Sequence, residues 1–459
     1  MRRKENEPLP SKEDNWIIRV YILRIIIVGA GVTGLRLFAR LKKEHEVVII
    51  DKNPNMGKKL LMTGNGRCNL TNTCDINTFV ERCTGDKKVL YSFLNHFGCR
   101  EIMEYFTSRG LVLKEEEEGR IFPESDRAED VLKVILNSIR SNSDKFLLKS
   151  ESENFIFEQK HKDFIAKSEQ NFSYDENSVV DFGKTRKFIK AVKVSGLWMS
   201  GNDLKGVVLE DDRRLAADVV IVTTGGASMP QTGSTGDGYA WFTEHGHNME
   251  ELYPLETAWV SNDNIVSCKN LQGVSFKGSV KIFGKKYSGD FVITHYGFSG
   301  PVALDLGGTV YKKAPCKAEF NFMEFEREEL ESILSSEKED INLNKVLRRY
   351  LPMSLLKQLF YDEILKSRWK NLNSKLRSEV LDKIVHYPAV IDGTRGMKHC
   401  FVTGGGLKMK DFNVKTLESL KIKGLYAAGE ILNIHGPLGG YNITICLSQA
   451  EAICRHLNK

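Results

Sequence analysis

The sequence predicts an α/β protein whose strands end at glycine-rich turns. The first observation is the stretch Arg24–Gly34, in which an apolar run leads directly into a glycine turn and then a helix. The second is another apolar run, Glu46–Ile50, which ends in Asp51 about 20 residues after the turn. The third is that two distant apolar runs, Val219–Val222 and Gly424–Ala428, also lead into glycine. Strand, turn, helix, strand and acid in one unit indicate a dinucleotide-binding domain.

Each glycine of the turn has a separate role. Gly29 allows the tight turn, Gly31 lets the backbone approach a pyrophosphate, and Gly34 lets helix and strand pack closely. The helix that follows presents unpaired N–H groups and the positive end of its dipole to the phosphates. Asp51 is placed to accept the ribose hydroxyls of an adenosine. The alternative is a glycine turn in an α/β domain of another kind.

Length and composition exclude several classes of protein. A chain of 459 residues is too long for one core, so two or three domains are expected. The net charge of +6, from 66 basic and 60 acidic residues, permits an anionic cofactor without indicating a nucleic-acid surface. No run reaches the ~18 apolar residues that span a membrane. Nine cysteines without a Cys-x-x-Cys pair argue against a disulfide scaffold and a metal site, and favour a cytoplasmic protein.

The remaining elements follow in order along the chain. Helical periodicity marks residues 88–97, 101–109 and 127–141, and the acidic run Glu115–Glu118 between them is expected to be a solvated turn. From 144 to 222 the pattern favours short strands, and residues 256–322 alternate like a small β subdomain. Residues 325–385 are helical in pattern and rich in leucine. The last helix carries a core-facing apolar stripe from Ile443 to Leu457.

Three distant pieces of sequence are expected to form one site. They are the N-terminal turn, the strand ending in Thr224-Gly225, and the strand ending in Gly429-Glu430, which Gly439-Gly440 and a helix follow. Glu430 supplies an acid that can bond a ribityl chain. A helix N-terminus near the pyrimidine edge of a flavin stabilises the reduced form. Together these features favour a flavin dinucleotide.

Three further motifs carry a resemblance to a known family. They are Gly64-Asn-Gly-Arg-Cys-Asn69, Thr294-His-Tyr-Gly-Phe-Ser-Gly-Pro301 and Gly439-Gly-Tyr-Asn442. With these, the chain resembles the bacterial FAD-binding oxidoreductases of the aminoacetone oxidase or bile-acid dehydro-reductase type, over about residues 23–457. The resemblance departs at Asn433, where the family often has Asp, and at His435 and Thr223.

The resemblance implies bound FAD and a glutathione-reductase-type Rossmann-like domain that is split by insertions. Residues 1–22 would be a disordered extension, 23–255 and 396–459 the FAD-binding domain, 256–324 a β subdomain and 325–395 a helical subdomain. The residues expected to bind the cofactor are Gly29, Gly31, Gly34, Asp51, Lys52, Lys59, Gly66, Arg67, Cys68, Asn69, Thr224, Gly225, Gly429, Glu430, Gly439, Gly440, Tyr441 and Asn442.

Two residues are catalytic candidates. His295 lies at the expected return from the β subdomain, where it would move a proton during hydride transfer at flavin N5; the alternative is a structural histidine. Arg67 would hold a substrate carboxylate or carbonyl, or brace its loop against the FAD phosphates. Cys68 is either a thiol beside the flavin or a small buried side chain. Arg395 and His435 are pocket candidates by their place in glycine-rich loops.

The function expected is that of an FAD-dependent oxidoreductase acting on a small organic molecule, with NAD(P)H left open as a transient electron donor. The alternatives are an RNA-modifying flavoprotein, which would need a basic face, and a flavin-binding protein without catalysis. No nucleic-acid or membrane partner is expected, and the oligomeric state is left open.

Overall fold

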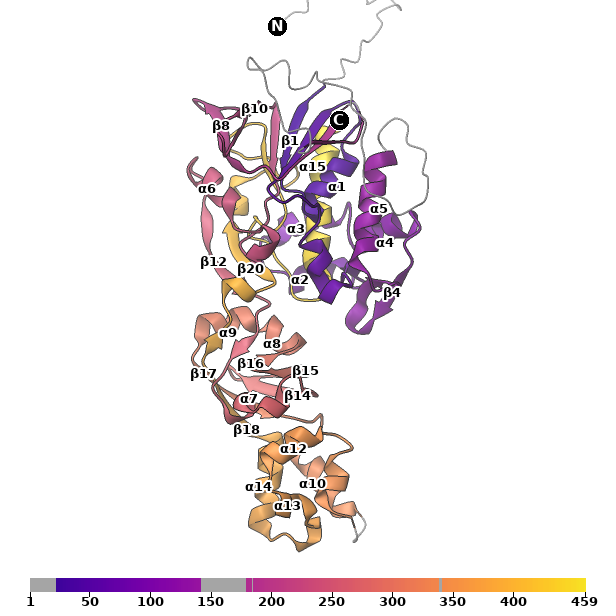
Figure 1. Cartoon of the computed structure of the whole chain (residues 1–459), viewed down its shortest axis with the longest axis vertical. Helices are drawn as coiled ribbons and strands as arrows, with labels where there is room; N and C mark the ends of the chain where they lie inside the picture. The colour runs from indigo at the N-terminus through magenta and orange to yellow at the C-terminus, as the bar shows by residue number, and fades with distance from the viewer. Residues whose placement is uncertain (1–21, 142–178, 184, 338–340) are drawn as a thin grey trace, which may run out of the picture.

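The structure is a computed structural model that describes residues 22–141, 179–183, 185–337 and 341–459. Figure 1 shows an elongated molecule: a sheet flanked by helices holds both ends of the described chain, a second sheet lies below it, and a group of helices forms the far end. The predicted α/β fold is confirmed. The expectations for residues 1–21 and for 142–178 lie outside the described residues.

The first sheet contains the predicted glycine turn. Its strand order is β21-β11-β1-β2-β7-β6, and all neighbours are parallel except β6 and β7. The strands are β1 (Arg24–Val28), β2 (Glu46–Asp51), β6 (Val179–Asp181), β7 (Arg186–Lys190), β11 (Val219–Val222) and β21 (Leu425–Ala427). The apolar residues of β1, β2 and β11 are almost fully buried, as expected for parallel strands covered on both faces. The carboxyl ends of β1, β2, β11 and β21 therefore lie at one edge.

Helices from the two ends of the chain cover this sheet together. Helix α1 (Val32–Arg40) packs against α15 (Tyr441–Leu457), which carries the predicted apolar stripe. A buried ion pair, 2.8 Å long, joins Arg36 to Glu451 between them. The Arg36 guanidinium also lies over the ring of Tyr105, 4.1 Å from its centroid. The N- and C-terminal segments thus build one domain.

Smaller elements surround the sheet. They are β3 (Thr71–Asn72), α2 (Ile76–Arg82), α3 (Lys87–Leu94), α4 (Cys99–Thr107), β4 (Leu113–Glu116), β5 (Arg120–Pro123) and α5 (Ala128–Ser141) on one side, and β8 (Val194–Ser200), β9 (Asp203–Leu209), β10 (Arg214–Ala216) and α6 (Asp237–Thr243) on the other. The expected turn at Glu115–Glu118 is wrong in its first half, because Glu115 and Glu116 belong to β4 and pair with β5.

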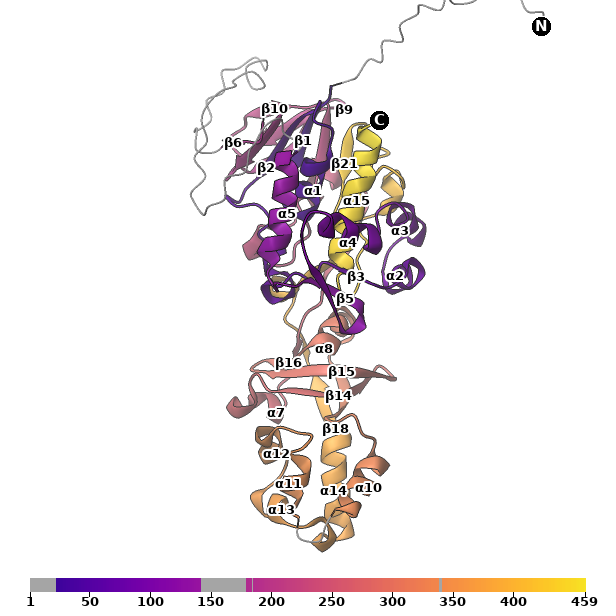
Figure 2. The ribbon, with the colours of Figure 1, turned by 90° about the vertical axis from the view of Figure 1, so that its right-hand side faces the viewer.

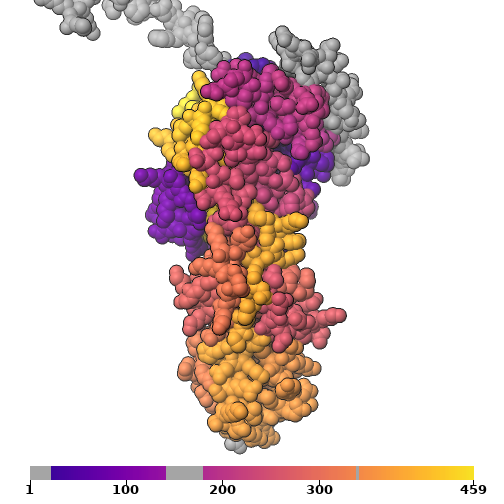
Figure 3. Space-filling view, turned by 90° about the vertical axis from the view of Figure 1, so that its left-hand side faces the viewer, coloured from indigo at the N-terminus to yellow at the C-terminus, as the bar shows by residue number. Residues whose placement is uncertain are grey.

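The chain leaves and re-enters the upper domain through adjacent strands. Strand β12 (Met249–Leu255) is antiparallel to β20 (Val402–Leu407), and beyond them β13 (Trp259–Val260) pairs with β19 (Gly393–Thr394). Figure 3 shows the outgoing and returning segments side by side at the narrow junction. Two strand pairs therefore join the upper domain to the rest.

The second sheet has the order β16-β15-β14-β17-β18 and is antiparallel throughout. Its strands are β14 (Ser275–Ile282), β15 (Lys285–Thr294), β16 (Gly297–Ser299), β17 (Cys316–Asn321) and β18 (Tyr387–Ile391), with α7 (Asn264–Ser267), α8 (Pro301–Asp305) and α9 (Gly307–Lys313) beside them. Its core is aromatic: the stacked rings of Phe298 and Phe320 lie 4.4 Å apart. Figure 2 shows this sheet edge-on between the upper domain and the helices.

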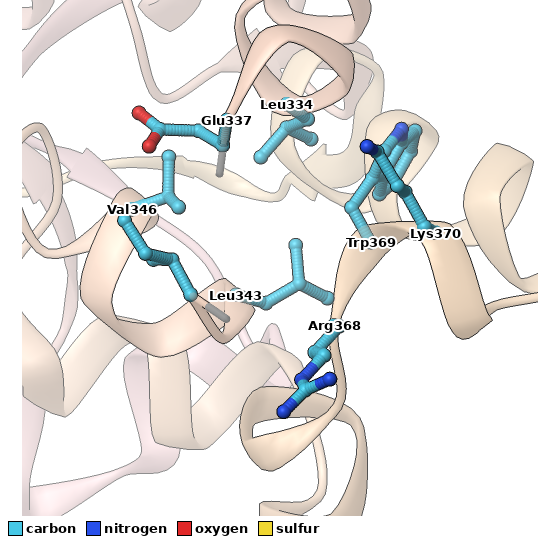
Figure 4. A pocket seen from close by; sticks show the side chains of 8 residues that line it. Leu334, Glu337, Leu343, Val346, Arg368, Trp369 and Lys370 are labelled. Carbon is cyan, nitrogen blue, oxygen red and sulfur yellow. The ribbon is translucent and has the colours of Figure 1, made fainter. Parts of the chain in front are cut away.

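The far end is formed by α10 (Arg327–Ser336), α11 (Leu343–Leu347), α12 (Met353–Leu359), α13 (Asp362–Lys366) and α14 (Ser374–Val385). The expectation that residues 325–395 form a helical subdomain is corrected at its end, because β18 lies within that range and pairs with β17. The returning chain thus completes the second sheet. A cavity among these helices, seen in Figure 4, has a volume of about 10 Å³, enough for roughly one water.

No helix among the described residues is long and apolar enough to cross a membrane.

Candidate cofactor and substrate site

The glycine turn has the geometry that its sequence predicts. Gly29 has φ +108°, and a Cβ there would lie 2.4 Å from the carbonyl oxygen of Thr223. A Cβ on Gly34 would lie 2.0 Å from the carbonyl oxygen of Gly29. A Cβ on Gly31 would meet no described atom within 4 Å. The first and third glycines thus permit close packing, and the second faces open space at the N-terminus of α1.

Asp51 ties the turn to the end of β2. Its carboxylate accepts hydrogen bonds from the backbone N–H of Ala30 (2.7 Å) and from the backbone N–H (2.7 Å) and side-chain amide (3.0 Å) of Asn53. Each oxygen of an ionised carboxylate has two acceptor sites, so capacity remains for a ribose hydroxyl. The neighbouring Lys52 is paired with Asp237 and Thr235 at the start of α6.

Glu430 follows β21 and accepts hydrogen bonds from three donors on separate segments. Its Oε2 accepts from Lys59 Nζ (2.6 Å), and its Oε1 accepts from Ser228 Oγ (2.6 Å) and the backbone N–H of Thr403 (2.8 Å). Burial raises the pKa of a carboxyl, but the Lys59 charge and the hydrogen bonds from Lys59, Ser228 and Thr403 outweigh it, so the pKa of Glu430 is lowered. Glu430 is therefore an ionised acceptor that joins three segments.

The loop 57–72 contains a second ion-pair group. The guanidinium of Arg67 forms two hydrogen bonds with the carboxylate of Glu116 (2.9 and 2.8 Å), lies 3.3 Å from Asp126, and stacks over Phe122. Cys68 is fully buried, and burial raises the pKa of its thiol to about 12. A neutral, buried thiol packs as a small apolar side chain. Gly66 (φ +87°) lies in the turn before Arg67.

The end of β11 contributes an unpaired hydroxyl. Thr224 Oγ1 is buried and has no hydrogen-bond partner in the described part of the chain. Gly225 follows with φ +75°, which favours glycine. On the neighbouring strand, the N–H of Gly429 donates to the side-chain oxygen of Gln449 at 2.6 Å. A buried hydroxyl without a partner costs free energy unless a ligand or water supplies one.

The N-terminus of α15 begins at two glycines with positive φ, Gly439 (+118°) and Gly440 (+90°). A Cβ on Gly440 would lie 2.3 Å from the carbonyl oxygen of Thr71, so the helix start packs directly on β3. The side-chain amide of Asn69, turned so that its groups match their neighbours, bonds Thr71 and Gly440. Gly440 has no side chain to cap the helix, which leaves its first N–H groups available to an anionic or carbonyl ligand.

Tyr441 and Asn442, the first two residues of α15, connect the helix start to neighbouring segments. The hydroxyl of Tyr441 accepts a hydrogen bond from Arg82 (3.3 Å), and its ring packs on Phe79. Asn442 accepts from the backbone N–H of Gly436 (2.9 Å) through Oδ1, and its Nδ2 donates to Glu256 (3.2 Å). The helix start is thus connected to residues outside the predicted FAD site.

His295 and Arg395 lie apart from these groups. His295 is exposed in the turn between β15 and β16, and its one contact recorded for the described residues is with the ring of Tyr296. Arg395 lies over the same ring, 4.3 Å from its centroid, and bonds His399. The roles predicted for His295 and Arg67 stay predictions. The structure brings neither residue into the cavity described next.

A cavity of about 450 Å³ lies where the upper domain meets the second sheet, and we call it the junction cavity. The lining residues that carry its chemistry are Arg82, Tyr253, Glu256, Asp305, Lys312 and His435. Tyr253 Oη lies 3.3 Å from His435 Nε2, and Lys312 Nζ lies 3.5 Å from the centre of the Tyr253 ring. The loop 430–442 links both sites, because Glu430 bonds Lys59 at one end and Gly436 lines the cavity further on.

The titratable groups of the junction cavity are strongly shifted. Burial raises the pKa of Glu256 well above its usual value, and the nearby charges of Asp305 and Glu430 add to the effect. Burial also raises the pKa of Asp305 to about 6. Burial and the charge of Lys312 lower the pKa of His435 to about 4. At neutral pH His435 is therefore neutral, and the cavity favours the protonated form of Glu256 more than water does.

Sequence reasoning identified His435 but missed most of this cavity. Glu256 follows a strand without a motif, and Asp305 and Lys312 lie on short helices that the alternating pattern did not reveal. The sequence signal that could have pointed to this cavity was the change of composition near residue 256. Such a change marks a domain junction, and pockets are common at domain junctions.

Comparison with known proteins places these features in context. A family model described as the HI0933-like protein Rossmann domain matches residues 23–186 and 183–456. The chain is 27% identical to a 3-dehydro-bile acid delta(4,6)-reductase of Clostridium scindens, over 92% of this chain and 95% of that protein. It is also 27% identical to a ribosomal RNA dihydrouridine synthase of Haemophilus influenzae, over 95% of this chain and 98% of that protein.

Among solved structures, the chain resembles a 3-ketosteroid-delta4-(5alpha)-dehydrogenase of Rhodococcus jostii RHA1, determined with 4-androstene-3,17-dione. The TM-score is 0.50 at 12% identity, over 98% of this chain and 99% of that chain. At this level of identity, the similarity shows a shared fold and nothing further.

Proposed function

The chain belongs to the HI0933-like Rossmann-domain family of FAD-binding oxidoreductases, and from that premise we propose that it reduces a carbon–carbon double bond conjugated to a carbonyl group. The observation that carries this proposal is the junction cavity, which holds proton donors and cations and shares the loop 430–442 with the cofactor residues. The substrate we favour is a small cyclic molecule with a conjugated carbonyl.

The residues of the upper domain fit FAD. The open space at Gly31 and the uncapped start of α1 suit the pyrophosphate, and Asp51 suits the adenosine ribose. The buried Thr224 hydroxyl has a free acceptor and donor for the cofactor. Glu430 is an ionised acceptor for a ribityl hydroxyl, and the start of α15 suits the pyrimidine edge. When bound and reduced, FAD supplies the hydride equivalent.

The residues of the junction cavity then have separate tasks. Tyr253 can donate a hydrogen bond from Oη to a substrate carbonyl, while His435, neutral at pH 7, holds that hydroxyl in place. Lys312 and Arg82 give the cavity a positive potential, which favours electron-rich carbonyl groups and an enolate-like transition state.

The names of the two relatives support the same bond chemistry. A 3-dehydro steroid with double bonds at positions 4 and 6 and the uracil ring of uridine both contain a double bond conjugated to a carbonyl. The cations at the cavity also favour a second candidate, a uridine within RNA, since phosphates would be attracted there. The small cyclic substrate and the RNA-borne uridine differ in size but not in the bond that is reduced.

A direct experiment uses the purified FAD-loaded protein without oxygen. NADH and NADPH are added in turn while flavin absorbance is followed, and then 4-androstene-3,17-dione or unmodified ribosomal RNA is added. We expect reoxidation of the flavin with a saturated steroid product, detected by mass spectrometry. Dihydrouridine in the RNA would favour the second candidate. Reoxidation by neither would contradict the proposal.

A control variant tests the cofactor assignment. Gly31→Trp places a large side chain in the open space at the start of α1 and should abolish FAD binding with an unchanged circular dichroism spectrum. Retention of FAD by this variant would argue against the assigned pyrophosphate position.

A further inference from the structure

Glu256 is a buried acid in an unusual backbone conformation. Its φ is +48°, in the left-handed region that glycine favours, and the residue is 7% exposed. Such a conformation is unfavourable in a residue other than glycine and persists where the surrounding structure imposes it. Glu256 follows β12 at the point where the chain leaves the upper domain, so the strain lies at the domain junction.

The hydrogen bonding of this carboxyl is incomplete. Oε1 accepts one hydrogen bond, from Asn442 Nδ2 at 3.2 Å, and Oε2 has no recorded partner among the described residues. Because the carboxyl lines the junction cavity, its free oxygen is available to a ligand there. A buried ionised carboxylate normally receives several donors, as Glu430 does, so this one is arranged for the neutral acid.

The charged groups around Glu256 point to the same conclusion. Asp305 on α8 and Glu430 after β21 are acids that disfavour a second negative charge, while Lys59 acts in the opposite direction. His435, whose pKa is lowered to about 4 by burial and the charge of Lys312, also lines the cavity, as do Tyr253, Lys312 and Arg82. The Lys59 charge is already engaged by Glu430 at 2.6 Å.

We propose that Glu256 holds a proton at neutral pH and donates it, from the oxygen facing the junction cavity, to the α-carbon of a conjugated carbonyl substrate. This inference rests on the proposed function. As the π bond of the substrate breaks, Glu256 supplies the proton for the α-carbon, and the hydride for the β-carbon would come from reduced FAD. The carboxylate that remains is reprotonated from water entering the cavity.

The first test detects the proton on Glu256 by infrared spectroscopy, without substrate turnover. The protein is labelled with ¹³C-glutamate, and its infrared spectrum is compared with that of Glu256→Gln at pH 7. We expect the wild type to show the carbonyl band of a protonated glutamic acid that the variant lacks. In Asp305→Asn the band should disappear at a lower pH than in the wild type, because the variant lacks the Asp305 negative charge that disfavours ionisation of Glu256. The inference is overturned if the wild type shows no such difference at pH 7.

The second test measures transfer of the proton. Glu256→Gln should keep its FAD and lower the reduction rate of the substrate by at least ~100-fold, the lower end of the effect of losing a general acid. Glu251→Gln is the matched control, because Glu251 is an exposed glutamate on β12, the strand that Glu256 follows. Normal turnover in Glu256→Gln would overturn the donor role. A protonated Glu256 in a wild type that reduces neither substrate would instead contradict the proposed function.

Discussion

Two buried glutamates near the loop 430–442 behave in opposite ways. Glu430 receives hydrogen bonds from three donors, one of them a lysine, and its pKa is lowered. Glu256 receives one, and its pKa is raised. Burial opposes ionisation at both, so the number and charge of the donors decides the outcome. The upper domain thereby holds an ionised acceptor, whereas the junction cavity favours the protonated form of its glutamate.

The largest effect is expected from Glu430→Ala. Lys59, Ser228 and the Thr403 N–H would lose their common acceptor, and a charge-assisted hydrogen bond contributes about 1.5–3 kcal/mol. FAD binding should weaken roughly 10- to 150-fold while the fold is retained. The ratio of flavin to protein absorbance after dialysis measures this. Unchanged retention would show that Glu430 does not contact the cofactor.

Lys59→Met should raise the pKa of Glu430 while leaving the Glu430 side chain in place. A carboxyl with a lowered pKa contributes stability above its unfolded pKa of about 4.3, and that contribution is lost as the pH falls through the folded pKa. Without Lys59 the pKa of Glu430 rises, so the free energy of unfolding should fall by about 1.5–3 kcal/mol at pH 7, the contribution of a hydrogen bond to a charged group. Denaturant unfolding from pH 4 to 8 measures the change. Equal curves for both proteins would mean that Lys59 does not hold Glu430 ionised.

Glu256→Gln should have the opposite dependence on pH. A carboxyl with a raised pKa contributes stability below about pH 4.3, and this contribution is lost as the pH rises through the folded pKa. The variant should therefore be more stable than the wild type at pH 8, by about 1 kcal/mol, and the difference should shrink at pH 4. Thermal unfolding at both values tests it, with Glu251→Gln as control. A variant less stable at pH 8 would contradict a neutral Glu256.

The smallest effect is expected from His295→Asn. The side chain is exposed, so the free energy of unfolding should change by less than about 0.5 kcal/mol. Turnover should change by less than about threefold, since His295 does not line the junction cavity. A loss of ~100-fold with FAD retained would make His295, instead of Glu256, the proton-transfer group.

The sequence predicted the features that depend on local pattern. The strand before Gly29, the acid at Asp51 and the stripe of the last helix were predicted because each repeats a short-range rule. The expected family and FAD cofactor are confirmed as well. The strand, the acid and the helix stripe all lie within the upper domain.

Features that depend on distant partners were not predicted. Sequence reasoning gave Arg67 two roles, holding substrate or bracing its loop against the FAD phosphates, and did not predict its contacts with Glu116 on β4 and with Asp126. The protonation of Glu256 depends on Asp305 and Asn442, which are far from it in sequence. Strand β18 was placed among helices because its partner, β17, precedes the whole helical segment.

The pairing of α1 with α15 has a consequence for synthesis of the protein. Arg36 and Glu451 are 415 residues apart, and translation at about 5–20 residues per second separates them by roughly 20–80 s. During that time the second sheet, whose strands all lie between β12 and β20, can form while α1 still lacks its partner helix. The nascent chain therefore exposes the apolar face of α1 until α15 has been synthesised, and we expect chaperones that bind apolar surfaces to recognise it during that time.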